Sequence, residues 1–183
     1  MKKGFTLIEM MIVVAIIAII AAIAIPSLLA ARRGSLETNA VGSCRAYCSA
    51  QTMFKRNDWD ADNVLEYADD FTLLNTQVDG TGATTIQLID SAFAAAEGVG
   101  GVPKHGYLFE DLVSIGGAAN PIDWINDYGL CGVPSSYGRS GYRTFIVCTN
   151  GTVFGRDIDL SAGPAFETDY PADPQGAGWI IAE

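Results

Sequence analysis

The stretch that decides the fold is MKKGFTLIEMMIVVAIIAIIAAIAIPSLLAARR, residues 1–33. Between Glu9 and Arg32 it holds 22 residues, of which only Ser27 has a polar side chain. At about 1.5 Å per residue, a helix of this length spans about 33 Å, enough to cross the roughly 30 Å hydrocarbon core of a bilayer. Backbone polar groups inside lipid must be paired within the segment itself. The sequence therefore predicts a membrane-spanning helix.

Two simpler explanations of this segment are a removable signal peptide and a plain membrane anchor. A signal peptide has a short apolar region and then a small-residue cleavage site, whereas this apolar run is longer and its helical pattern continues to about Lys55. A plain anchor does not explain Glu9, because a carboxylate at the start of an apolar span costs on the order of a few kcal/mol unless it has a partner. No basic residue within the span can pair with it. A free α-amino group from a second copy, produced by cleavage upstream, would supply the partner.

The charges of the chain are unevenly distributed. The formal net charge is −10, yet Lys2 and Lys3 precede the apolar run and the acids concentrate downstream of it. The lysine pair predicts that the N-terminus stays in the cytoplasm and that the bulk of the chain crosses the inner membrane. An acidic exported region argues against nucleic acid as the main partner, since phosphate binding depends on lysine and arginine.

The first nine residues, MKKGFTLIE, resemble the leader and mature start of type IV pilins and type II secretion pseudopilins. The shared features are a basic leader, Gly4 before the cut, Phe5 after it, Glu9 four residues on and a long apolar helix. The resemblance implies that a prepilin peptidase removes residues 1–4 and methylates the new amino group of Phe5. It also implies that Glu9 pairs with the Phe5 ammonium of a neighbouring subunit and sets the axial register of a filament. Pro26 falls where the family has its helix-interrupting proline, and it either kinks the helix or lets it bend during assembly.

The same resemblance implies a function. A pilin rests in the membrane until an assembly platform and its ATPase lift it into a helical polymer of itself, with minor pilins as further partners. We therefore expect a structural subunit of a type IV pilus or type II secretion pseudopilus, located finally in a periplasmic or cell-surface filament. The alternative is a minor tip subunit that acts as an adhesin or binding module. An enzyme is not expected, because no nucleophile-elbow pattern surrounds the serines near the lone histidine, His105.

The expected fold class is α+β, with a long N-terminal helix packed on a small antiparallel sheet. Residues 5–31 form the apolar part of the helix and residues 32–57 its amphipathic continuation, whose apolar face packs on the sheet. Residues 58–104 form a variable connection with a short helix near 64–74, a turn at 79–84, and either a helix or a strand followed by a helix at 86–97. Residues 105–183 contain three or four short strands and a C-terminal loop. The Asn150-Gly151 pair predicts a hairpin turn, and the β-prone part resembles G-type pseudopilins.

Four cysteines, Cys44, Cys48, Cys131 and Cys148, are disulfide candidates if the domain is exported. The first two lie one turn apart on the core-facing side of the helix, and the other two belong to strands expected to face it. Helix-to-sheet links would each add about 2–4 kcal/mol, whereas a 44–48 link within a regular helix would be strained. Three connectivities are open, and four free buried thiols are the alternative. A zinc or haem site is not expected, since the chain has no CxxC pair.

Acidic residues also crowd the C-terminal tail. The resemblance to G-type pseudopilins, which often hold calcium in this loop, makes Asp157, Asp159 and Asp169 calcium candidates. Their spacing matches no EF-hand, and a solvated acidic loop is the favoured interpretation. No other cofactor is expected.

Overall fold

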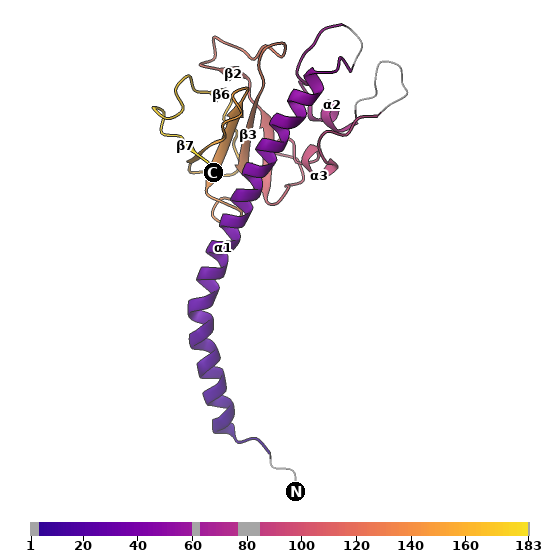
Figure 1. Cartoon of the computed structure of the whole chain (residues 1–183). Coiled ribbons are helices and arrows are strands. Elements are labelled where there is room, and N and C mark those ends of the chain that lie inside the picture. The colour runs from indigo at the N-terminus through magenta and orange to yellow at the C-terminus, as the bar shows by residue number, and fades with distance from the viewer. Residues whose placement is uncertain (1–3, 60–62, 77–84, 183) are drawn as a thin grey trace.

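The computed structural model describes residues 4–59, 63–76 and 85–182. A single long helix, α1 (Leu7–Lys55), carries a small head on its C-terminal half, and its N-terminal half extends away from the head (Figure 1). The buried residues of α1 begin at Ala40. The expected α+β fold, a long N-terminal helix packed on an antiparallel sheet, is confirmed. Most of the expected ranges 5–31 and 32–57 falls within this one continuous helix.

The head is built on a five-stranded antiparallel sheet of order β1-β3-β4-β5-β7. Its strands are β1 (Tyr107–Asp111), β3 (Gly129–Pro134), β4 (Arg143–Cys148), β5 (Phe154–Asp157) and β7 (Ile180–Ile181). A separate parallel pair joins β2 (Ser114–Ile115) to β6 (Asp169–Tyr170). The expected hairpin turn is confirmed: Gly151 has φ of 71° and links β4 to β5, and such a positive φ suits glycine.

The sheet separates two hydrophobic cores. Because side chains alternate along a strand, Phe145 and Val147 of β4 pack in the core on the α1 side, while Ile146 and Cys148 pack in the core on the opposite face. Short helices complete the first core, and the C-terminal tail, through residues such as Trp179, closes the second. α1 therefore covers one face of the sheet only.

The connection between α1 and the sheet is less helical than expected. It contains α2 (Phe71–Thr76), which begins later than the helix expected near 64–74. It also contains α3 (Ser91–Ala94), preceded by irregular residues 86–90, where a helix or a strand followed by a helix was expected over 86–97. One reason is Gln51 of α1, whose amide accepts from Ala68 N and donates to Ala68 O, both at 2.8 Å. This side chain satisfies the backbone groups that a helix would otherwise pair. The turn expected at 79–84 lies outside the described residues.

Candidate functional site

The predicted cleavage point lies in an extended segment before α1. Gly4, Phe5 and Thr6 are exposed and non-helical, and the helix begins at Leu7. The Phe5 side chain is 78% exposed, and no described atom lies within 4 Å of the position that a Cβ on Gly4 would take. The bond between Gly4 and Phe5 is thus accessible to another protein. Lys2 and Lys3 of the expected leader lie outside the described residues.

Glu9 has a partner within its own chain. Thr6 caps α1: its backbone N–H donates to Glu9 Oε2 at 2.8 Å, and its hydroxyl donates to the same oxygen at 2.6 Å. In return Glu9 N donates to Thr6 Oγ1 at 3.3 Å, which completes a capping box. Sequence reasoning sought a partner only in a second copy and missed Thr6. The T-x-x-E spacing of Thr6 and Glu9 was the signal that could have found it.

The N-terminal half of α1 presents an apolar surface that the described part of the chain leaves uncovered. Large side chains from Leu7 to Leu29 are exposed, Ile23 for example at 74%, and the helix is long and apolar enough to cross a membrane. An apolar surface of this size needs lipid or another protein around it. Pro26 lies inside this half, where its ring nitrogen cannot donate a hydrogen bond, yet the helix continues through it (Figure 1).

The two helix cysteines and the two strand cysteines lie on opposite sides of the sheet. All four thiols are free. Cys44 belongs to the core beneath α1 and Cys48 packs against that core, whereas Cys131 and Cys148 belong to the core on the other face. The strands β3 and β4 that carry Cys131 and Cys148 pack against α1, as expected. The two cysteine side chains nevertheless point to the opposite face, because their neighbours Leu130 and Val147 occupy the positions that point to α1. The disulfide connectivity stays a prediction that this packing does not support.

Each of the three calcium candidates accepts hydrogen bonds from a different part of the chain. Asp157 accepts from the Tyr137 hydroxyl at 2.8 Å and Asp159 from Ser161 N at 3.0 Å. Asp169 accepts from the Ser114 hydroxyl at 2.6 Å and from Gly117 N at 2.8 Å. Within residues 4–59, 63–76 and 85–182, no three His, Cys, Asp or Glu residues form a group that could hold a metal ion.

The lone histidine lies on the surface, and the serines near it are engaged with one another. His105 is exposed in the turn before β1, as predicted, with φ of 50°. Ser140 Oγ donates to Ser136 O at 2.9 Å and accepts from Ser136 N at 3.0 Å. This pair of bonds closes the turn between β3 and β4 on itself.

A half-buried carboxyl group at the end of β1, Asp111, was not singled out by its sequence. It accepts a hydrogen bond from the Tyr47 hydroxyl of α1, which in turn accepts from Gln51 Nε2 at 2.8 Å. Burial raises the pKa of Asp111 to about 7, and repulsion from Glu97 and Asp70 adds to this effect, while the Tyr47 bond opposes it. The folded head therefore favours the protonated acid.

This shift predicts a pH-dependent stability. Because the folded pKa of Asp111 lies above its ordinary value of 3.8, its contribution is full below about pH 4 and is lost as the pH rises through about 7. The free energy of unfolding of the full chain in detergent should fall over that window by at most about 4 kcal/mol. Denaturant titrations at several pH values measure it, and Asp111→Asn should flatten the curve.

The matched control is Asp159→Asn. Hydrogen bonds from Ser161 lower the pKa of Asp159, so this carboxyl contributes a pH dependence of the opposite sign. The Asp159→Asn chain should keep the fall in stability between pH 4 and 7. An Asp111→Asn chain with the same slope as the unmodified chain would contradict the assignment.

Comparison with known proteins bears on both the apolar helix and the head. Residues 1–25 match the family model of the prokaryotic N-terminal methylation motif, and residues 23–179 match a family described as protein of unknown function (DUF2950). A stretch of 36 residues, 20% of this chain, is 67% identical to 28% of the type IV wide pilus major component PilA4 of Thermus thermophilus. A stretch of 53 residues, 29% of this chain, is 50% identical to 24% of the type IV major pilin protein PilA of Myxococcus xanthus.

These curated relatives are matched over only 28% and 24% of their own length. No solved structure matches the chain. The methylation motif at the start of an exposed apolar helix, with a β head at the other end, defines a membrane-anchored, pilin-like protein. The chain belongs to the type IV pilin family, and through residues 23–179 to the DUF2950 family.

Proposed function

We propose that the chain is a structural subunit that polymerises from the membrane into a type IV pilus. The observation that carries this proposal is the uncovered apolar half of α1, which follows directly from a processing motif. Lipid tails and the packed helices of a filament are both apolar surroundings, so the segment can move from one to the other with little change in solvation. The same helix therefore serves as a membrane anchor first and as a filament core afterwards.

Processing creates the charge that the assembly step uses. Cleavage after Gly4 leaves an ammonium on Phe5, at the end of α1 where the helix dipole is positive and disfavours a cation. Glu9 in its own chain already receives two bonds from Thr6, and both use Oε2. Oε1 is then the oxygen offered to the Phe5 ammonium of a neighbouring subunit. In an apolar filament core this pair offsets part of the desolvation of both charges and fixes the register of one subunit on the next.

The proposed route follows from these two steps. The N-terminus stays in the cytoplasm, where a prepilin peptidase cuts the leader, while the acidic head lies on the far side of the inner membrane. A membrane-embedded platform with its ATPase then lifts subunits into the filament, joined by minor pilins. Secretion through a pseudopilus uses the same α1 chemistry, and so does a minor tip subunit with adhesive or binding function.

Imaging and composition test the proposal together. Filaments sheared from cells that carry this chain should contain the chain as their main protein by mass spectrometry, beginning at Phe5. Deletion of its gene should remove those filaments. Filaments in which the chain is present only in traces would favour the minor tip subunit, and filaments that never leave the periplasm would favour a pseudopilus.

A further inference from the structure

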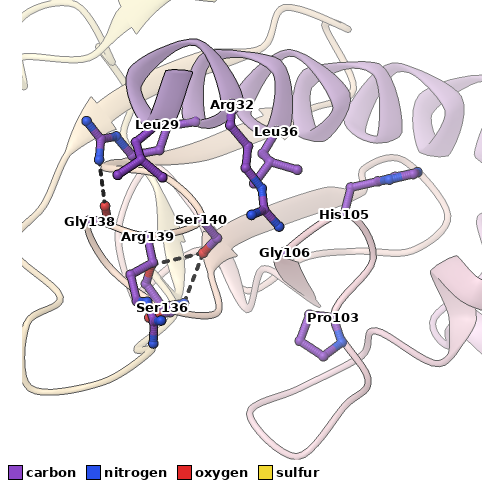
Figure 2. Close-up of a pocket in the computed structure, with 11 residues that line it drawn as sticks. Leu29, Arg32, Leu36, Pro103, His105, Gly106, Ser136, Gly138, Arg139 and Ser140 are labelled. Carbon is purple, nitrogen blue, oxygen red and sulfur yellow. Dashed lines mark hydrogen bonds between the residues drawn. The ribbon is translucent and has the colours of Figure 1, made fainter. Parts of the chain in front are cut away.

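A basic cavity lies where α1 passes from its apolar half to the head (Figure 2). Its volume is about 710 Å³. Arg32 and Arg33 line it from α1, and Arg139 lines it from the turn between β3 and β4. The apolar side chains Leu29 and Leu36 form part of the same wall. The cavity thus combines cations with hydrocarbon.

Among the described residues, no acidic side chain lines this cavity. Glu37, the acid that follows on α1, accepts from Tyr142 N and from Arg143 Nε, each at 2.9 Å. The Glu37 carboxylate is therefore already bound by Tyr142 and Arg143 at the start of β4. In a chain of net charge −10, three lining arginines without a described lining acid form a local excess of positive charge.

The arginines differ in how they are held. Arg33 donates to Gly138 O at 3.2 Å, and its guanidinium lies 5.2 Å from the centre of the Tyr142 ring. Arg33 therefore helps to fix the turn that carries Arg139. Arg32 and Arg139 are less constrained, and Figure 2 shows Arg32 extending from α1 toward the loop at Gly106. Among the described residues, neither of these two guanidinium groups has a side-chain hydrogen bond or ion pair, so both keep their donors for an anion.

The cavity has a defined depth relative to a membrane. From Leu29 to Leu36 the helix rises by about 10 Å at 1.5 Å per residue. The polar headgroup layer of one leaflet is about 5–8 Å thick, and Leu29 belongs to the apolar run that crosses the hydrocarbon. When α1 spans a bilayer, the cavity therefore lies at the level of the lipid phosphates on the side of the head.

We infer that this cavity binds the headgroup of an anionic phospholipid. Arg32 and Arg139 hold the phosphate, for which guanidinium groups are suited by charge and fork geometry, and Leu29 and Leu36 contact the start of the acyl chains. The apolar wall is continuous with the lipid-exposed half of α1, which favours a lipid over a carboxylate of a second copy. The bound lipid fastens the head to the membrane surface before assembly. This inference depends on the membrane position of α1 and not on polymerisation.

Native mass spectrometry of the full chain in detergent tests the site. We would titrate in phosphatidylglycerol, or phosphatidylcholine with the same acyl chains, and count bound lipids. The unmodified chain should retain phosphatidylglycerol preferentially. Each arginine contributes about fivefold in affinity near an anionic lipid surface, so Arg32→Gln with Arg139→Gln should weaken phosphatidylglycerol binding roughly 25-fold and leave phosphatidylcholine binding unchanged. Inorganic phosphate at the same concentration should not displace the lipid, because it lacks the acyl contacts.

The matched control is Arg56→Gln. Arg56 is exposed at the far end of α1, outside the cavity, and its replacement removes the same charge. The control should bind phosphatidylglycerol like the unmodified chain, and circular dichroism should show all variants equally folded. Unchanged phosphatidylglycerol preference in the double variant would overturn the inference.

Discussion

A Glu9→Gln chain should be cleaved and held in the membrane, yet it should form no filaments. Glutamine keeps the size of the side chain and can still bond to Thr6 N, so the capping box survives while the charge is lost. The Phe5 ammonium of each neighbour would then be buried without an anion. Breaking a buried ion pair in this way costs about 3–5 kcal/mol, which weakens each subunit contact by about a hundred- to several-thousandfold. Electron microscopy of sheared filaments and the mass of the processed chain measure both parts of this result.

A Thr6→Ala chain tests the helix cap while the negative charge of Glu9 is kept. It removes the hydroxyl that accepts from Glu9 N but leaves the carboxylate ionised, and loss of such a cap costs about 0.5–2 kcal/mol of helix stability. Filaments should persist in this variant with frayed helix starts. If Glu9→Gln or Glu9→Ala chains assembled normally, pairing between subunits could not be what sets the register.

A Gly4→Leu chain should remain full length and unassembled. No described atom lies within 4 Å of the Cβ position at Gly4, so the new side chain leaves the fold intact and acts only on the approach of the peptidase. Intact mass spectrometry should show the four-residue leader retained on nearly every molecule, with an unmethylated Phe5. Without the Phe5 ammonium, Glu9 has no partner in the next subunit, so filaments should be absent too.

Gly34→Ala is the control for that experiment. Gly34 also has open space around its Cβ position, but it lies within α1 and far from the cleavage point. This chain should lose its leader normally. Removal of the leader from the Gly4→Leu chain at the normal rate would show that the peptidase does not recognise Gly4.

The long helix was predictable because a 22-residue apolar run has few other solutions, and the β4–β5 turn was predictable because Asn150-Gly151 favours a positive φ. The cap at Thr6 was also predictable, because the T-x-x-E spacing of Thr6 and Glu9 is that of a capping box, whose carboxylate is held by hydrogen bonds and needs no ionic partner. The two-residue strands β6 and β7 could not be predicted, since such short elements in an irregular tail show no alternating pattern.

The face of the sheet to which each strand cysteine points is set by the register of its strand. Cys131 lies next to Leu130, and one residue of shift along β3 exchanges which of them points to α1. The sequence has apolar residues at both positions, because both faces of this sheet are buried, so its pattern cannot choose between them. Asp111 was hidden for a similar reason: an acid near the end of a strand resembles a surface residue until Tyr47 of the distant helix packs over it.

The core on the α1 side of the sheet and the core on its other face have different roles in the molecule. The contacts proposed to join one subunit to the next reside on α1, while the tail that closes the second core folds back on its own sheet. The outer coat of such a polymer can therefore diverge under selection without disturbing its scaffold. Such a division would leave one short, strongly similar segment in common between this chain and other pilins, as is found with the type IV pilins of Thermus thermophilus and Myxococcus xanthus.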